Sequence, residues 1–291
     1  MELNDSEERG SVEDRRGGKK SLAIGGGIGA VVIALVASAI GIDPKFLQMF
    51  VGGGGVGGGG AQTQGTGKPD GYSDFSAKLL GSTNSVWKEQ FRKNRYTKNR
   101  GAAYEEPGMV LFSDQVDSGG CGVAPSAVGP FYCPASKKVF LDPTFFEELE
   151  SKLGGSKAEF SQAYVIGHEV GHHVQNLLGY ETESYKAKDG KDNAGIRMEL
   201  QADYLAGVWA YHAKDKLKIN QDDIASALKT ARSIGDNRIQ EKMKGKSWPE
   251  SFNHGRDDQR LKYFKLGFQN GDASEATLNK FFDRNVKPLD L

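Results

Sequence analysis

The stretch AYVIGHEVGHHVQNLLG, residues 163–179, places two histidines four residues apart, with a glutamate directly after the first. On a helix, four residues turn the chain by about 400° and raise it by about 6 Å, so His168 and His172 face the same way. The apolar residues around them recur with helical spacing: Val165, Ile166, Val170, Val174 and Leu177. The sequence therefore predicts a metal site on a half-buried helix.

Glu169 lies about 100° around this helix from His168, which is a poor position for a third ligand. The pattern H-E-x-x-H on a helix is typical of zinc sites in which the glutamate is the general base. We therefore expect His168 and His172 to bind Zn²⁺. We expect Glu169 to take a proton from a water that the metal activates and to pass it to the leaving amine.

A catalytic zinc usually has three protein ligands and one open position. One known motif supplies a glycine three residues and a histidine six residues after the second histidine, but Gln175 and Leu178 stand there. The segment RMELQAD instead offers Glu199, with Asp203 one turn later on the same face. We predict Glu199 as the third ligand and Asp203 as acceptor of a ligand histidine's N–H.

The alternative for Glu199 and Asp203 is a solvated helix face. The residues around them are largely apolar (Met198, Leu200, Leu205, Val208 and Trp209), which favours partial burial. A buried acid needs a partner, and a metal supplies one.

Two further histidines have different interpretations. His254, in FNHGRDDQR, stands in a predicted loop before a helix, from where it could donate to the oxyanion of a tetrahedral intermediate. Packing or capping is the alternative for His254. His173 points about 100° away from His172 and is interpreted as structural.

The N-terminal region carries a topological signal. Residues 22–42 contain no charge and would measure about 31 Å as a helix, which matches a bilayer core of about 30 Å. One cation, Lys45, follows this run closely, whereas four precede it: Arg15, Arg16, Lys19 and Lys20. The positive-inside rule predicts one transmembrane helix (residues 21–42) in the inner membrane, with residues 1–20 as a charged cytoplasmic tail and the remainder periplasmic or extracellular.

Two further interpretations of this segment remain open. Ala37-Ser38-Ala39 fits a signal-peptide cleavage site, which would release a soluble protein. Gly25 and Gly29 form a G-x-x-x-G pattern that could pair two such helices in a homo-oligomer, although a glycine-rich span also produces it.

The composition of the chain sets its other boundaries. Residues 43–71 are glycine-rich and are expected to form a flexible linker, so the globular domain is expected at residues 72–291. The 38 Lys and Arg balance the 38 Asp and Glu and are dispersed, which argues against nucleic-acid binding.

The only two cysteines, Cys121 and Cys133, lie twelve positions apart. In an oxidising compartment such a pair is more often a disulfide than two free thiols. Metal binding is the alternative, but the spacing matches no common structural zinc knuckle.

The predicted domain is mostly helical, with a small sheet before the metal helix. Helices are expected at 73–94 (capped by Ser73, with a break at 81–84), 143–153 (capped by Asp142), 157–178, 196–215, after the Asn220 cap and after Gly255, and strands at 109–113, 129–133 and 137–142. The expected fold class is α+β: a zincin-like domain preceded by one transmembrane helix.

Several separated motifs resemble the bacterial YpfJ-type neutral zinc metallopeptidase family over nearly the whole chain. They are SVEDRRG, CG with GPFYCP and VFLD, GHEVGHHVQ, ELQAD with AGVWA, and HG followed by QR and YF. Tyr204 and Arg256-Asp257 depart from the pattern, where Cys and Ser-Ser are common, and neither is a proposed ligand. The resemblance implies a membrane-anchored zincin of the gluzincin-like kind and says little about its substrate.

The expected function is zinc-dependent hydrolysis of peptide bonds in a polypeptide substrate. Zincins commonly hold substrate along a strand edge beside the metal helix, and residues 131–141 are the expected edge. The alternative is a catalytically inert, zinc-binding scaffold in the cell envelope. The presence of Glu169 argues against it, because a scaffold has no chemical need for a base.

Overall fold

The computed structural model describes residues 1–3, 8–17, 71–97, 103–180, 194–244, 246–247, 254–283, 285–287 and 290 of the 291-residue chain. The predicted membrane span, the linker, the Gly25–Gly29 pattern and the alternative cleavage site lie outside these residues. Within the described part of the chain, no helix has the length and apolarity to cross a membrane.

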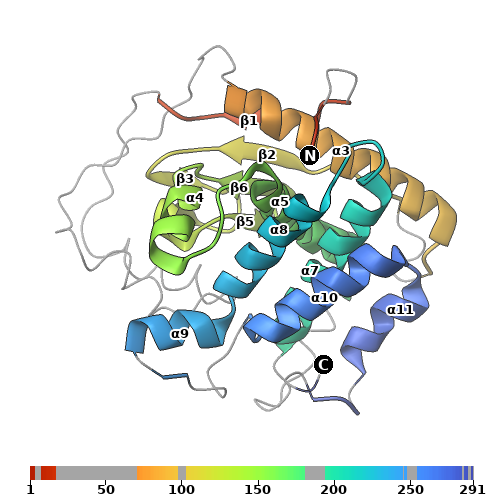
Figure 1. Ribbon diagram of the computed structural model, residues 1–291. Helices are drawn as coiled ribbons and strands as arrows, with labels where there is room; N and C mark the ends of the chain where they lie inside the picture. The colour runs from red at the N-terminus through yellow and green to blue at the C-terminus, as the bar shows by residue number, and fades with distance from the viewer. Residues whose placement is uncertain are drawn as a thin grey trace.

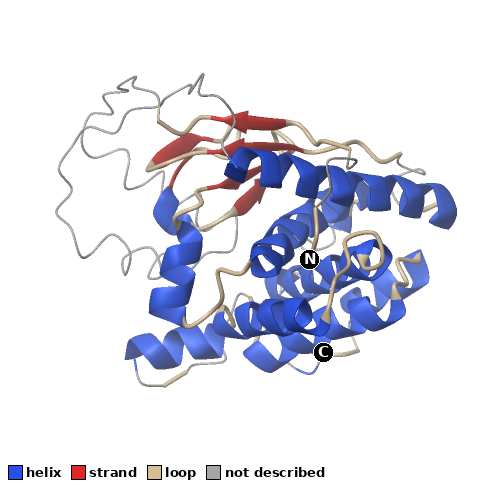
Figure 2. Cartoon of the chain, turned by 45° about the horizontal axis from the view of Figure 1, so that its top comes forward, coloured by secondary structure: helices blue, strands red, loops and turns tan. Residues whose placement is uncertain are grey.

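Four strands form the main sheet, in the order β1-β2-β6-β5. They are β1 (Val12–Asp14), β2 (Gly108–Leu111), β5 (Phe131–Cys133) and β6 (Lys138–Leu141). β1 and β2 pair in parallel, as do β2 and β6, whereas the outer strand β5 pairs antiparallel with β6. Figure 2 shows the strands gathered at one end of the molecule, with most of the helices below them.

Side chains alternate between the two buried faces of this sheet, as the period of two in a strand requires. Met109, Leu111, Val139 and Leu141 belong to the main core, which the helices share. Val110, Phe140, Phe131 and Cys133 point into a second core, which also holds Val116 and Ala124 of a small antiparallel pair. That pair is β3 (Gln115–Asp117) with β4 (Val123–Pro125). Both faces are covered, which explains the continuous apolar runs of β2 and β6.

Helices cover the face of the main core. α3 (Gly71–Asn94) packs against β1, α5 (Glu159–Leu178) packs against β5 and β6, and the two helices touch each other. α7 (Ala194–Ala213) lies against α5, and α10 (Asp257–Asn270) lies against α7 (Figure 1). Among the described residues, the other helical segments are α4 (Phe145–Glu148), η3 (Leu149–Leu153), α8 (Gln221–Ser233), α9 (Asp236–Lys244), α11 (Glu275–Asn279), η2 (Ser126–Val128) and η5 (Lys280–Phe282).

The predicted mixture of helices and a small sheet is confirmed, and several local expectations need correction. The cap of α8 is as predicted, since the Asn220 side chain accepts from the Asp223 N–H and Asp223 returns a bond to the Asn220 N–H. α3 begins at Gly71, two residues before the expected cap Ser73. α4 begins after Thr144, two residues later than expected, although the Asp142 carboxylate accepts from the Thr144 N–H and hydroxyl.

The N-terminal segment departs most from the sequence analysis, which treated residues 1–20 as a tail outside the domain. Residues 12–14 form the strand β1, paired with residues 109–111 of β2. Arg15 and Arg16, two cations of the topological signal, pair with Glu13 at 2.8 Å and Asp14 at 2.5 Å. For the described residues, this segment is therefore part of the folded domain.

Gly81 explains how the segment fits. A Cβ at this position would lie 1.5 Å from the backbone oxygen of Glu8, and the Gly10 N–H donates to the Ala77 oxygen at 2.8 Å. α3 runs without interruption through the expected break at residues 81–84. Gly81 therefore allows the N-terminal segment to cross close to α3, and it does not break the helix.

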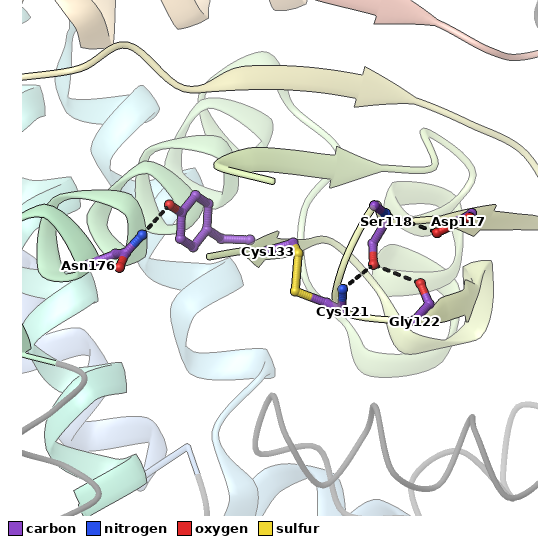
Figure 3. The surroundings of a disulfide bond; sticks show 8 residues. Asp117, Ser118, Cys121, Gly122, Cys133 and Asn176 are labelled. Carbon is purple, nitrogen blue, oxygen red and sulfur yellow. Dashed lines mark hydrogen bonds between the residues drawn. A yellow bond between two sulfur atoms is a disulfide. The ribbon is translucent and has the colours of Figure 1, made fainter. Parts of the chain in front are cut away.

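Cys121 and Cys133 form the predicted disulfide, with their Cα atoms 5.9 Å apart. The bond links the loop between β3 and β4 to the outer strand β5 (Figure 3). On the same loop, the Ser118 hydroxyl accepts from the Cys121 N–H and donates to the Gly122 oxygen. The disulfide therefore fastens the β3–β4 pair to the edge of the main sheet.

Candidate metal centre

Two glycines of α5 allow α7 to approach closely. A Cβ at Gly171 would lie 3.0 Å from the Ala202 oxygen, and one at Gly167 would lie 3.1 Å from the Trp209 ring. Each glycine directly precedes a histidine of the H-E-x-x-H pattern: Gly167 precedes His168, and Gly171 precedes His172. The spacing of the glycines therefore brings the acidic residues of α7 next to the histidines of α5.

The ring nitrogens of both histidines converge on Glu199. His168 Nε2 lies 3.2 Å from one carboxylate oxygen of Glu199, and His172 Nε2 lies 3.4 Å from the other. Within the described residues, His168, His172 and Glu199 form a group whose ligand atoms lie within 4.8 Å of one another. The predicted third ligand thus lies beside the two histidines.

These separations fit a zinc ion. Ligand atoms about 2.0–2.1 Å from a tetrahedral metal lie about 3.3 Å from each other. His168 Nε2 and His172 Nε2 lie 3.2 and 3.4 Å from the two oxygens of Glu199, which is close to that value. Two imidazoles and one carboxylate are also a usual donor set for a catalytic zinc with one open position. The three side chains can hold the metal.

The other ring nitrogen of each histidine has its own partner, which fixes the tautomer. His168 Nδ1 lies 2.9 Å from Asp203 Oδ1, as the sequence analysis predicted for Asp203. His172 Nδ1 lies 2.8 Å from Gln175 Oε1, and the Gln175 amide donates to the Met198 oxygen and to Gln201. Both acceptors take an N–H from Nδ1, so both Nε2 atoms keep a lone pair for a metal.

Charge in the site follows from this arrangement. Burial disfavours the protonated imidazoles, yet the Asp203 and Glu199 carboxylates raise the pKa of His168, and Glu199 raises the pKa of His172. Burial opposes ionisation of Glu199, but the two histidines lower its pKa well below the usual value. A metal ion would compete with protons for the imidazole nitrogens, so metal affinity should depend on pH.

Glu169 is buried, with 7% of its surface exposed, and it lies outside the ligand group. Burial raises the pKa of Glu169, while the neighbouring histidines lower it in part. A carboxylate with a raised pKa is a stronger proton acceptor near neutral pH. Glu169 thus has the surroundings expected of a general base.

His254 is held by Asp236, the first residue of α9. One oxygen of Asp236 lies 3.0 Å from His254 Nδ1, and the other accepts the N–H groups of His254 and Gly255 at 2.6 and 3.0 Å. Burial opposes a charged ring, but the Asp236 carboxylate, with a contribution from Glu199, raises the pKa of His254. Asp236 thus orients the His254 ring and favours its protonated form, and no motif in the sequence pointed to Asp236.

His173 does not belong to the metal centre. It is fully buried, its Nε2 donates to the Glu105 oxygen at 2.6 Å, and its Nδ1 accepts from the Tyr132 hydroxyl at 2.9 Å. Asn176 donates to the same hydroxyl at 2.9 Å (Figure 3). The structure thus agrees with the structural role predicted for His173, which connects α5 to β5.

Comparison with known proteins points to the same chemistry. Residues 1–280 match the family described as "Putative neutral zinc metallopeptidase". The chain is 35% identical over 288 residues to the uncharacterised protein YpfJ of Escherichia coli (strain K12), covering 92% of this chain and 95% of that protein. It is 44% identical over 181 residues to the uncharacterised proteins Mb2605 of Mycobacterium bovis and Rv2575 of Mycobacterium tuberculosis, covering 59% of this chain and 61% of each.

No solved structure matches the chain. The family match extends over nearly the whole length, including β1, and the resemblance inferred from the motifs is confirmed. The zinc prediction is confirmed as well, because the family description names this metal and the His168–His172–Glu199 group can bind it. The chain belongs to the neutral zinc metallopeptidase family.

Proposed function

We propose that this protein is a zinc-dependent peptidase that hydrolyses peptide bonds in polypeptides. The observation that carries the proposal is the convergence of His168 Nε2, His172 Nε2 and the Glu199 carboxylate, whose ligand atoms lie within 4.8 Å of one another. Bound zinc supplies an electrophile that activates water and polarises a carbonyl group.

The protein's own residues carry the protons and position the substrate. Glu169, on the same helix as both histidines, accepts the proton of the attacking water and delivers it to the leaving amine. His254, oriented through Asp236, donates from its other ring nitrogen to the developing oxyanion. This division of roles requires Glu169 to accept a proton while His254 remains charged, and the pKa of each is shifted in that direction.

The edge of the main sheet suits an extended polypeptide. The expected substrate edge, residues 131–141, includes β6, but β6 is internal, between β2 and β5. The candidate substrate-binding edge is therefore β5 alone (Phe131–Cys133), which packs against the metal helix α5. We propose that substrate adds to β5 as a further strand, with the Cys121–Cys133 disulfide fixing the end of β5.

A test of the function combines metal analysis with cleavage of a peptide library. Wild type and Glu169→Gln should each bind about one zinc per chain, because glutamine keeps the size of the side chain and Glu169 is no ligand. Glu169→Gln should lose about 10²–10⁴-fold in cleavage rate, since an amide cannot accept the proton of water. Equal cleavage by the two proteins would exclude Glu169 as the base. Wild type that binds zinc and cleaves nothing would favour the inert scaffold.

The compartment also belongs to this proposal. The disulfide favours an oxidising compartment for the domain, periplasmic or extracellular, as expected from the sequence. A single crossing at residues 21–42 would, however, put β1 and β2 on opposite faces of a membrane, and the two strands pair. We therefore propose that residues 1–17 lie on the same side as the metal centre. Membrane attachment and helix pairing through Gly25 and Gly29 remain predictions.

Two matched cysteine variants distinguish these topologies. Ser11 and Ser151 are both exposed: Ser11 directly precedes β1 in the N-terminal segment, and Ser151 lies in η3. Ser11→Cys and Ser151→Cys should both react with a maleimide that cannot cross membranes, in spheroplasts that are intact. Labelling of Ser11→Cys only after lysis, with Ser151→Cys labelled before it, would restore the single-pass orientation.

A further inference from the structure

Arg260 of α10 is a buried cation beside the metal ligands, with 3% of its surface exposed. Its Nε donates to Asp203 Oδ2 at 2.8 Å and one terminal nitrogen donates to Asp203 Oδ1 at 3.1 Å. The same terminal nitrogen lies 3.8 Å from Glu199 Oε2. One guanidinium therefore contacts both acidic residues that α7 contributes to the site.

The position of Arg260 follows from a close crossing of two helices. A Cβ at Gly207 of α7 would lie 2.2 Å from the Phe264 oxygen, and one at Gly267 of α10 would lie 2.1 Å from the Tyr204 oxygen. The helix backbones therefore touch at these glycines. Asp203 stands one turn before Gly207 and Arg260 two turns before Gly267, so the crossing brings the two side chains together.

Asp203 is completely buried and is the residue through which Arg260 reaches His168. Its Oδ1 lies 2.9 Å from His168 Nδ1 and also accepts the Tyr164 hydroxyl at 2.5 Å. A carboxylate buried without compensation is strongly unfavourable, and removal of one partner from a buried ion pair is strongly destabilising. The two bonds from Arg260 compensate the charge and fix the carboxylate plane, so that Oδ1 faces the imidazole.

We propose that Arg260 is a positioning residue for the metal centre: it holds Asp203 so that His168 presents Nε2 to the metal, and its charge lies next to Glu199 as the third ligand. This inference rests on the proposed zinc site. Arg260 cannot itself be a metal ligand, because a guanidinium has only hydrogen-bond donors and no lone pair to offer. Its effect is therefore transmitted through Asp203 and Glu199.

The test measures zinc affinity of the full-length protein by competition with a chromogenic chelator, together with the absorption spectrum of the Co²⁺-substituted protein. Arg260→Gln should bind zinc about 10–100-fold more weakly, as changes in outer partners of metal ligands do, and should alter the Co²⁺ spectrum. Arg260→Lys keeps the charge but loses the paired donors, so its affinity should lie between those of Arg260→Gln and wild type.

Arg197 provides a matched control. It is a buried arginine on α7 that donates to the backbone oxygens of Phe281 and Asp283, so it connects α7 to the C-terminal segment. Arg197→Gln should lower the melting temperature and leave zinc affinity and the Co²⁺ spectrum unchanged. A purely structural role for Arg260 would give the same result for Arg260→Gln.

The outcomes separate this inference from the proposed function. Folded Arg260→Gln with the zinc affinity and Co²⁺ spectrum of wild type overturns the inference alone. If Arg260→Gln does not fold, Arg260→Lys decides, and wild-type affinity and spectrum in that variant overturn the positioning role of the paired donors. Wild type that does not bind zinc at one ion per chain overturns the proposed function first.

Discussion

Gly171 of α5 meets Ala202 of α7 so closely that a Cβ on the glycine would lie 3.0 Å from the alanine backbone oxygen and 3.2 Å from its Cα. The helix that carries both histidines and the helix that carries Glu199 are therefore held at backbone contact. Their separation sets the distances of 3.2 and 3.4 Å between the histidine nitrogens and Glu199.

Gly171→Val should consequently weaken both the fold and the metal site. The added side chain must push α7 away, and overpacking of this kind costs about 1–3 kcal/mol of unfolding free energy. Zinc affinity should fall with it, since the third ligand moves with α7. Gly71→Val is the control, because Gly71 is exposed and a Cβ there meets nothing within 4 Å. Denaturant unfolding and chelator competition measure the two effects, and wild-type values for Gly171→Val would show that the interface can relax.

The ligands could be predicted from the sequence because they follow from local spacing. His168 and His172 lie one turn apart, and Glu199 and Asp203 lie one turn apart on a second helix. Their outer partners could not. Arg260 is 57 positions from Asp203, and that pair depends on how α7 and α10 cross. Asp236 is 18 positions from His254, and that pair depends on how the loop before α10 meets the start of α9. Gln175 is closer to its partner His172, yet glutamine on a helix carries no signal of burial by itself.

The N-terminal strand was missed for a different reason. β1 is three residues long and its sequence, VED, lacks the alternation of apolar and polar residues that predicts a strand. It pairs with a strand almost a hundred residues later, and the charges beside it resemble a topological signal. The same arginines that suggest a cytoplasmic tail form ion pairs within the segment.

His254 and Asp236 should act as a pair in catalysis. His254→Ala should lower kcat by about 10²–10³-fold, the loss found when one oxyanion donor is removed, while zinc content stays at the wild-type level. Asp236→Asn should shift the pH profile of kcat, since the carboxylate raises the pKa of His254. The protonated ring would then be lost at a lower pH, and the fall in activity on the alkaline side should move towards acid. An unchanged profile in Asp236→Asn would confine Asp236 to holding the loop.

His173 should make the fold sensitive to acid. Burial lowers the pKa of His173 to about 4, below the value of about 6.5 expected in the unfolded chain. As the pH falls, the unfolded chain binds the proton first. The contribution to stability is therefore complete above about pH 6.5 and is lost between about pH 6.5 and 4, by roughly 3 kcal/mol in total.

Denaturant unfolding at pH 7 and pH 4.5, in the presence of chelator, checks this in wild type and His173→Gln. The variant should be less stable at pH 7 and should lose less stability on acidification. His212→Gln, which removes an exposed histidine, is the matched control. The same dependence in wild type and His173→Gln would assign the acid sensitivity to other groups.

Gly81→Ala should have opposite effects in two versions of the chain. In the full chain, the new Cβ would lie 1.5 Å from the Glu8 oxygen, so the N-terminal segment must leave α3 and the variant should be less stable than wild type. In a chain that begins at residue 71, nothing from that segment is present, and alanine should stabilise the interior of α3 by up to about 1 kcal/mol relative to glycine. The full chain and the shortened chain, each with and without Gly81→Ala, form a thermodynamic cycle. The free energy of unfolding of each is measured with denaturant at one pH. A change of sign between the two backgrounds places residues 8–10 on α3 in solution, on the same side as the metal centre. Equal stabilisation in both would mean that the segment does not pack at Gly81, and would return residues 1–20 to the role of a separate tail.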